Sequence, residues 1–162
     1  MATELLISPH KEAALAQPMT DNFSLAGELQ STHRAIHRIC DSLESIADSL
    51  PANVDRRICH SLSQELVPAI KAAQEFEEMK IFPAVRKAAG GRESVLETVS
   101  RLEYEHFEDL CFAEEVADVL RRLSNGAAVN IEAVGYMLRG LFGALRRHIV
   151  FEEGYLETMT HY

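Results

Sequence analysis

The chain has 162 residues, the usual size of one domain, and it is too short for two domains with separate cores. Hydrophobic residues make up 47% and charged residues 25%, which allows an ordinary core and argues against wholesale disorder. The net charge of -9 has the wrong sign for a phosphate-binding surface, so no nucleic-acid partner is expected.

The three cysteines, Cys40, Cys59 and Cys111, are an odd number without paired spacing. They argue against a disulfide framework or a zinc knuckle, and they favour a reducing, cytoplasmic location. Residues 1–11 lack the basic region and apolar stretch of an export signal, and basic side chains interrupt the most apolar helix-length segment, 134–151. We therefore expect neither export nor a membrane-spanning helix.

A polar arm is expected over residues 1–22, followed by one helical domain over residues 23–162. Capping and breaking residues divide this domain into four blocks, at about 23–50, 53–91, 92–123 and 130–156. Each block is rich in Ala, Leu, Glu and Arg, which predicts helices. Four long helices with short connections predict an all-α, antiparallel up-down-up-down four-helix bundle, in which Pro68 and Pro83 kink or locally break the second helix.

Each expected helix carries an apolar stripe with 4-3-4-3 spacing, which should face the core. The stripe of the second helix is the least regular: Ile58, Leu62, Leu66, Ala69, Ala73, Phe76 or Glu77, and Lys80. Polar residues occupy inward positions of the other stripes, namely His33, His106, His148 and Glu152. A single inward histidine is usually an ordinary core or boundary residue, so the question is whether these side chains converge.

Height along the bundle, at about 1.5 Å per residue from the shared loops, places Glu77, His106 and His148 level within one turn. His33 comes out roughly 8 to 10 Å from level with Glu77 by the same count. Inward polar groups without partners cost several kcal/mol, and a bound metal would remove that cost. A mixed set of imidazoles and carboxylates without cysteine favours iron or manganese over structural zinc.

Four short segments carry a family pattern: Leu29-Gln-Ser-Thr-His33, Glu77-Glu-Met-Lys-Ile-Phe-Pro83, Glu105-His106 and His148-Ile-Val-Phe-Glu152. Over about residues 25–156 the chain resembles the hemerythrin-like (HHE cation-binding) family, whose four-helix bundles hold a non-haem di-iron centre. The resemblance implies iron, with the metal ligands His33, Glu77, His106, His148 and Glu152. It also implies that Glu77 and Glu152 are the bridging carboxylates.

Two positions depart from the family pattern. Ala73 stands where the family has a histidine on the second helix, and Leu102 stands where oxygen-carrying hemerythrins have a second histidine on the third. The five-histidine site of an oxygen carrier therefore cannot be assembled, and a mononuclear site is an alternative to a di-iron centre. The substitute ligands open to the sequence are Glu75, Glu78, Glu103 and His37.

Three functions remain open from the sequence. The preferred one is a cytoplasmic protein that binds non-haem iron to sense O2, NO, peroxide or iron, or to handle iron; it is a binding module more than an enzyme. The second is a di-iron redox enzyme that acts on peroxide or O2. The third is a metal-free helical interaction module, and an oligomer is compatible with all three.

Overall fold

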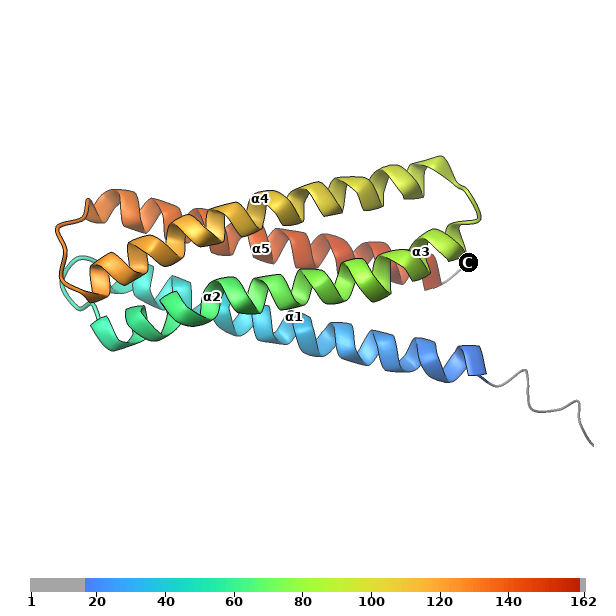
Figure 1. Cartoon of the computed structure of the whole chain (residues 1–162), viewed down its shortest axis with the longest axis horizontal. Helices are drawn as coiled ribbons and strands as arrows, with labels where there is room; N and C mark the ends of the chain where they lie inside the picture. The colour runs from blue at the N-terminus through green and yellow to red at the C-terminus, as the bar shows by residue number, and fades with distance from the viewer. Residues whose placement is uncertain (1–16, 161–162) are drawn as a thin grey trace, which may run out of the picture.

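The computed structural model describes residues 17–160 and the side chains of residues 25–156. Its elements are α1 (Gln17–Ser49), α2 (Arg56–Phe76), the π-helix η1 (Glu77–Ile81), α3 (Phe82–Ala89), α4 (Glu93–Ser124) and α5 (Ile131–Thr160). Because α2, η1 and α3 follow one another without a break, they form one of four antiparallel rods (Figure 1). The predicted all-α, up-down-up-down four-helix bundle is confirmed.

The packing of the rods decides which side chains can meet. The closest pairs are α2 with α4 and α1 with α5, and α1 also packs on α2 and α4 on α5. The α1 and α4 rods therefore lie diagonally across the bundle, as do α2 and α5. A residue that points to the bundle axis can thus contact residues on two flanking rods.

The helix ends follow local chemistry. The Asp55 side chain accepts hydrogen bonds from the backbone N–H groups of Arg57 and Ile58 and caps α2, and Asn130 caps α5 through Ala133. Gly90 ends α3 in the left-handed conformation that glycine tolerates best.

The prediction that the first helix begins only after residue 22 is wrong, because α1 already includes residues 17–22. Thr, Asp and Asn are cap formers but cost little inside a helix, so their presence did not mark the boundary. Residues 1–16 of the expected arm lie outside the described part of the chain, and the division between arm and bundle stays a prediction.

The two prolines of the second rod behave differently. Helix α2 continues through Pro68, whereas Pro83 lies at the start of α3, directly after the π-helix. In that π-helix the Phe82 N–H donates to the Glu77 carbonyl five residues back. Such π turns inside helices occur often at functional sites. This one places Glu77 and the buried ring of Phe82 on the same inner face.

The core consists of two apolar clusters, one toward each end of the bundle. Four of the buried polar side chains, His33, Glu77, His106 and Glu152, lie between these clusters. The predicted stripe of the second helix is wrong at its ends, because Ile58 is 48% exposed while Cys59 is buried, and Lys80 is exposed. The residues of α2 that face the core are displaced by one position at the start of the helix. The wider turn of η1 displaces the core-facing positions again after Glu77.

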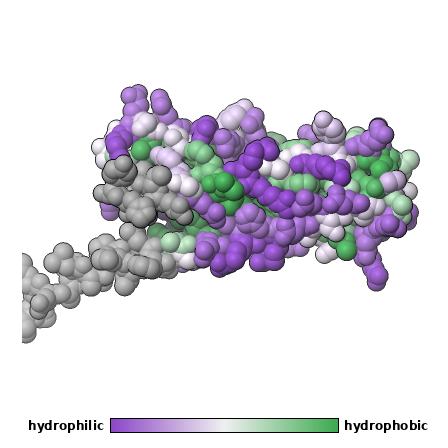
Figure 2. Space-filling view, turned by 180° about the vertical axis from the view of Figure 1, so that it is seen from behind, coloured by the Kyte–Doolittle hydropathy of each residue, from purple (hydrophilic) through white to green (hydrophobic). Residues whose placement is uncertain are grey.

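The outside of the bundle is polar over most of the face seen in Figure 2, with hydrophobic residues in small patches among the polar ones. No helix within residues 17–160 combines the length and apolarity that crossing a bilayer requires.

Candidate metal centre

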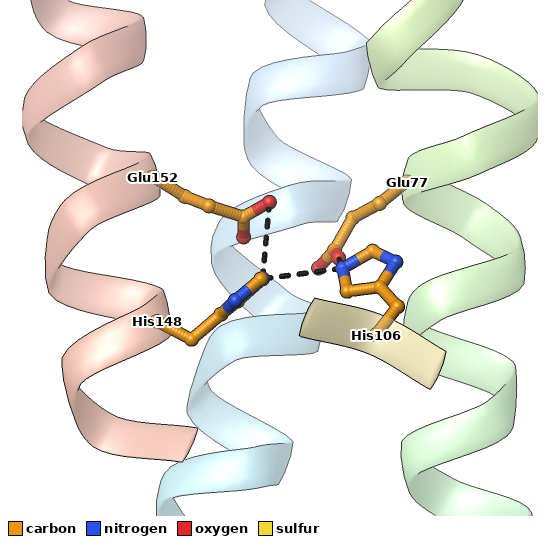
Figure 3. A group of neighbouring side chains, drawn as sticks. All are labelled: Glu77, His106, His148 and Glu152. Atoms are coloured by element: carbon orange, nitrogen blue, oxygen red, sulfur yellow. Dashed lines mark hydrogen bonds and ion pairs between the residues drawn. The ribbon is translucent and has the colours of Figure 1, made fainter. Parts of the chain in front are cut away.

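Four side chains from three rods meet between the two apolar clusters. Glu77, His106, His148 and Glu152 each offer one nitrogen or oxygen atom, and these atoms all lie within 4.8 Å of one another. Figure 3 shows the four side chains pointing toward one another from the helices that carry them. The predicted common height of Glu77, His106 and His148 agrees with this geometry, and the cluster of four could bind a metal ion.

His33 reaches the same centre from α1. Its Nε2 lies 3.2 Å from Oε2 of Glu152 and 3.6 Å from Oε1 of Glu77. The offset of His33 expected from counting residues is absent, because that count assumes that α1 ends at the height where α2 begins. Residues 50–55 connect the two helices and allow different heights at their ends.

The two carboxylates each face two histidines. Glu77 directs Oε2 to His106 Nε2 at 3.0 Å and Oε1 to His33, and Glu152 directs Oε1 to His148 Nε2 at 3.5 Å and Oε2 to His33. The centre thus has two sides that share both carboxylates. We call them the His106–His148 side and the His33 side.

Each histidine also contacts a carboxylate that lies farther out, through its other ring nitrogen. His106 Nδ1 donates to Glu78 at 2.9 Å, His148 Nδ1 to Glu105 at 3.2 Å, and His33 Nδ1 to Glu153 at 3.2 Å. Such carboxylates orient a ligating imidazole and keep the inner nitrogen free for a metal. We call Glu78, Glu105 and Glu153 the outer carboxylates.

The outer carboxylates follow an order around the bundle. The second rod orients the histidine on α4, α4 orients the histidine on α5, and α5 orients the histidine on α1. The remaining step would lead from α1 to a histidine on α2, where Ala73 stands instead. The series of histidines around the bundle, each oriented by a carboxylate of the preceding rod, therefore lacks its member on α2.

The inner atoms of the cluster need a cation among them. If the Nδ1–H groups of His106 and His148 donate outward, their neutral rings turn Nε2 lone pairs toward each other across 3.1 Å. The inner carboxylate oxygens of Glu77 and Glu152 are acceptors as well. Either extra protons or metal ions must lie among these acceptors, so the donor set fits a bound metal.

In the metal-free chain, the need for a cation among these acceptors raises the pKa values of the histidines. Burial alone would lower the pKa of His33, but hydrogen bonds with Glu152, Glu77 and Glu153 raise it to about 10. Burial would also lower the pKa of His148, and the hydrogen bond and charge of Glu152 raise it to about 9. In the metal-free protein these histidines therefore hold protons at neutral pH.

The pKa values of His106 and Glu152 also shift toward the charged form of each side chain. Burial opposes the charged form of His106, yet hydrogen bonds with Glu77 and Glu78 raise its pKa. Burial would raise the pKa of Glu152, but hydrogen bonds with His148 and His33 lower it to about 2. The carboxylate of Glu152 is thus charged at neutral pH.

The cluster has open space beside it. A cavity of about 30 Å³ adjoins the centre and is lined by residues of all four rods, including Ala73, Asp109 and His148. A larger groove of about 360 Å³ on the surface between α4 and α5 is also lined by Asp109 and His148. These two residues therefore line both the surface groove and the small cavity beside the centre.

The substitute ligands left open by the sequence lie elsewhere. Glu78 contacts His106 from outside the centre, Glu103 forms an ion pair with Arg86 at 2.8 Å, and Glu75 is exposed beside Lys71. His37 is half-buried and lines neither the cavity nor the cluster.

Sequence reasoning missed two kinds of residue. The roles of Glu105 and Glu153 depend on histidines of neighbouring rods, and the only signal for them is that each adjoins an inward residue in the chain. Asp109 was missed because Leu110 beside it continued the expected apolar stripe. Its spacing of three residues from His106 was the signal that could have found it.

The fold and the cluster define a class of protein: a four-helix bundle with a buried group of histidines and glutamates that could bind a metal. The family model of the hemerythrin HHE cation binding domain matches residues 25–159, and the chain belongs to this family. Searches of curated proteins and of solved structures gave no match.

Proposed function

We propose that the protein is a hemerythrin-like, non-haem di-iron protein that binds a small ligand such as O2 or NO and serves in sensing or iron handling. Its ligands are His106 and His148 on one side, His33 on the other, and the shared carboxylates of Glu77 and Glu152. The three free thiols, of which Cys40 and Cys59 are buried, favour a reducing cytoplasm for this function.

One observation carries the proposal of two ions rather than one. Both glutamates direct one oxygen to the His106–His148 side and the other to the His33 side, at 3.0 to 3.6 Å from the histidine nitrogens. A carboxylate that serves a single ion has no need of a histidine at each of its two oxygens. This arrangement is the one expected of bridging carboxylates between two adjacent ions.

Iron suits this donor set. Imidazole nitrogen and carboxylate oxygen together favour iron or manganese, and the cluster formed by the described residues contains no thiolate, which would select zinc or copper. When bound, ferrous iron supplies electrons and open coordination positions to small ligands. The chain's own residues orient the imidazoles through the outer carboxylates and exclude bulk water with the two apolar clusters.

The size of the neighbouring cavity limits the ligand. About 30 Å³ has room for one or two water-sized molecules and none for an organic substrate. The cavity adjoins His106 and His148, so a diatomic ligand there would lie beside the centre. This favours the binding of O2 or NO over the turnover of a larger compound.

The test is metal analysis of the whole chain after anaerobic reconstitution with ferrous iron and removal of excess metal. We expect two irons per chain and near-ultraviolet charge-transfer absorption after exposure to air. One iron per chain would restrict the proposal to a mononuclear site. No bound iron in a folded protein would reject it in favour of a metal-free interaction module.

A second candidate is a redox enzyme, favoured by the Ala73 position, which leaves the His33 side with fewer protein ligands than the other side. Open positions on that side would admit peroxide or O2. Sustained consumption of peroxide with a stoichiometric reductant, beyond one turnover per centre, would support the enzyme; binding without turnover supports the sensor.

A further inference from the structure

Asp109 occupies an unusual place in the bundle. It is a half-buried carboxylate on α4, and it lines both the small cavity beside the centre and the surface groove between α4 and α5. The charges of His148 and His106 both act on it. Within the described side chains, no hydrogen bond or ion pair of its carboxylate is found.

The position of Asp109 on its helix directs it to the centre. It is the third residue after His106, so both side chains lie on one face of α4, one turn apart. His106, His148 and Asp109 all line the same cavity, which also adjoins Glu77. Its carboxylate thus borders the same space of about 30 Å³ as His106 and His148, and in the metal-free chain it lies outside the group of four donors that are all within 4.8 Å of one another.

The charge of two bound ions gives a second reason for a further carboxylate at the centre. Two divalent ions bring four positive charges, and the inner carboxylates of Glu77 and Glu152 supply two negative ones. The outer carboxylates lie one imidazole farther away and are partly exposed to water, so they balance this charge less effectively. The three histidines are neutral when they bind metal. A buried excess of positive charge is costly, and one more carboxylate beside the His106–His148 side reduces it.

We propose that Asp109 is an additional carboxylate ligand of the ion on the His106–His148 side. This inference rests on the proposed function, because it needs a metal there. With Asp109, that side has two imidazoles and three carboxylates, of which two are shared with the His33 side. Asp109 thereby adds an oxygen ligand from α4, on which the residues one turn before and after His106 are the apolar Leu102 and Leu110.

The experiment is an anaerobic titration of the metal-free chain with Co2+, whose visible absorption reports coordination and whose affinity is measured against a chelator. Asp109→Asn keeps the size of the side chain and removes its charge, and Asp109→Glu keeps a carboxylate. Glu108→Gln is the matched control, because Glu108 is the adjacent residue and lines the same surface groove but not the cavity.

We expect Asp109→Asn to weaken one of two Co2+ binding steps by at least about 10-fold and to change the visible spectrum. Asp109→Glu should recover most of the affinity, and Glu108→Gln should match the native chain. The melting temperature of the metal-free Asp109→Asn chain should not fall, because burial disfavours the charge of Asp109 more than the charges of His148 and His106 favour it, which raises its pKa.

The inference is overturned if Asp109→Asn binds Co2+ with native affinity and spectrum. It is also overturned if Glu108→Gln weakens binding equally, because the overall negative charge of the groove, and not ligation by Asp109, would then explain the loss. A native chain that binds no Co2+ would instead reject the proposed function itself. The two failures are therefore distinguishable.

Discussion

The two sides of the centre differ although they share both carboxylates. The His106–His148 side has two histidines 3.1 Å apart, each oriented by an outer carboxylate, and Asp109 lies nearby. The His33 side has one oriented histidine, and Ala73 occupies the position across from it on α2. A single residue of the second rod makes the difference.

This comparison shows how a bundle can weaken one half of a centre without losing the other. The shared carboxylates of Glu77 and Glu152 stay in place because histidines on three rods contact them. The His106–His148 side should therefore bind its ion more tightly, and the His33 side should bind the second ion more weakly. The following predictions test that order.

Removal of a histidine from the stronger side should have the largest effect. We expect His148→Ala to weaken the tighter Co2+ or Fe2+ binding step by more than about 100-fold, since loss of a ligand should exceed the roughly 10- to 100-fold cost of losing an outer partner. Metal content after gel filtration should fall to one ion per chain or fewer. Elemental analysis and chelator competition measure both quantities.

His60→Ala is the control for that variant, because His60 is an exposed histidine on α2, in the first turns of the helix and outside the centre. It should bind metal as the native chain does. If His33→Ala cost more metal than His148→Ala, the assignment of the stronger side would be wrong.

Restoring the missing histidine should strengthen the weaker side. Ala73 is buried and lines the cavity, so Ala73→His directs an imidazole toward the space beside His33 and Glu77. We expect the weaker binding step to tighten by about 10-fold, which is about 1.4 kcal/mol. The larger side chain should also lower the free energy of unfolding of the metal-free chain by about 1–3 kcal/mol.

Ala69→His is the matched control, one turn earlier on the same face of α2. It adds the same side chain away from the shared carboxylates, so it should not tighten metal binding. Equal gains from Ala73→His and Ala69→His would mean that the gap at Ala73 does not limit the His33 side.

The outer carboxylates should have a smaller effect, and each should act on its own side. Glu105→Gln removes the charged partner of His148, and Glu153→Gln removes that of His33. We expect the former to weaken the tighter step by about 10-fold and the latter to weaken the second step by a similar factor. Titration with Co2+ separates the two steps.

Glu103→Gln serves as the control, since Glu103 pairs with Arg86 and not with a histidine. It should leave both steps unchanged. Equal weakening of both steps by Glu105→Gln would contradict the division of the centre into two sides.

The fold was predictable because each of its signals is local. Asp55 and Asn130 cap the helices whose starts they predicted, and Gly90 ends the second rod. The start of α1 was not predictable, because residues 20–22 favour a cap and yet fit inside a helix. The predicted inward positions were wrong at Ile58 and Lys80, because the buried face is shifted by one residue at the start of α2 and the wider π turn that begins at Glu77 shifts it again.

The inward positions of the centre were predictable for a similar reason. His106, His148 and Glu152 replace apolar residues in regular stripes, so one helix at a time reveals them. The outer carboxylates and Asp109 were not predictable in this way. Glu105 and Glu153 act on histidines of neighbouring rods, and the space beside Asp109 exists only once four rods are packed.

The smallest expected effect is the response of the metal-free chain to pH, in which protons take the place of metal. His33 and His148 have folded pKa values of about 10 and about 9, above their ordinary value near 6.5. A raised pKa stabilises the fold fully below the ordinary value, and the benefit is lost as pH rises through the folded value. Glu152, with its pKa lowered to about 2, stabilises the fold above about pH 4.5.

The metal-free chain should therefore be most stable between about pH 4.5 and 6.5 and should lose stability toward pH 10. We expect a loss of at least about 1 kcal/mol, which lowers the melting temperature by about 2–4 °C for a chain of this size. The loaded chain should show no such loss, because metal holds the imidazole nitrogens without their protons. A metal-free melting temperature that stays constant from pH 6.5 to 10 would show that these histidines are neutral and that another cation balances the carboxylates.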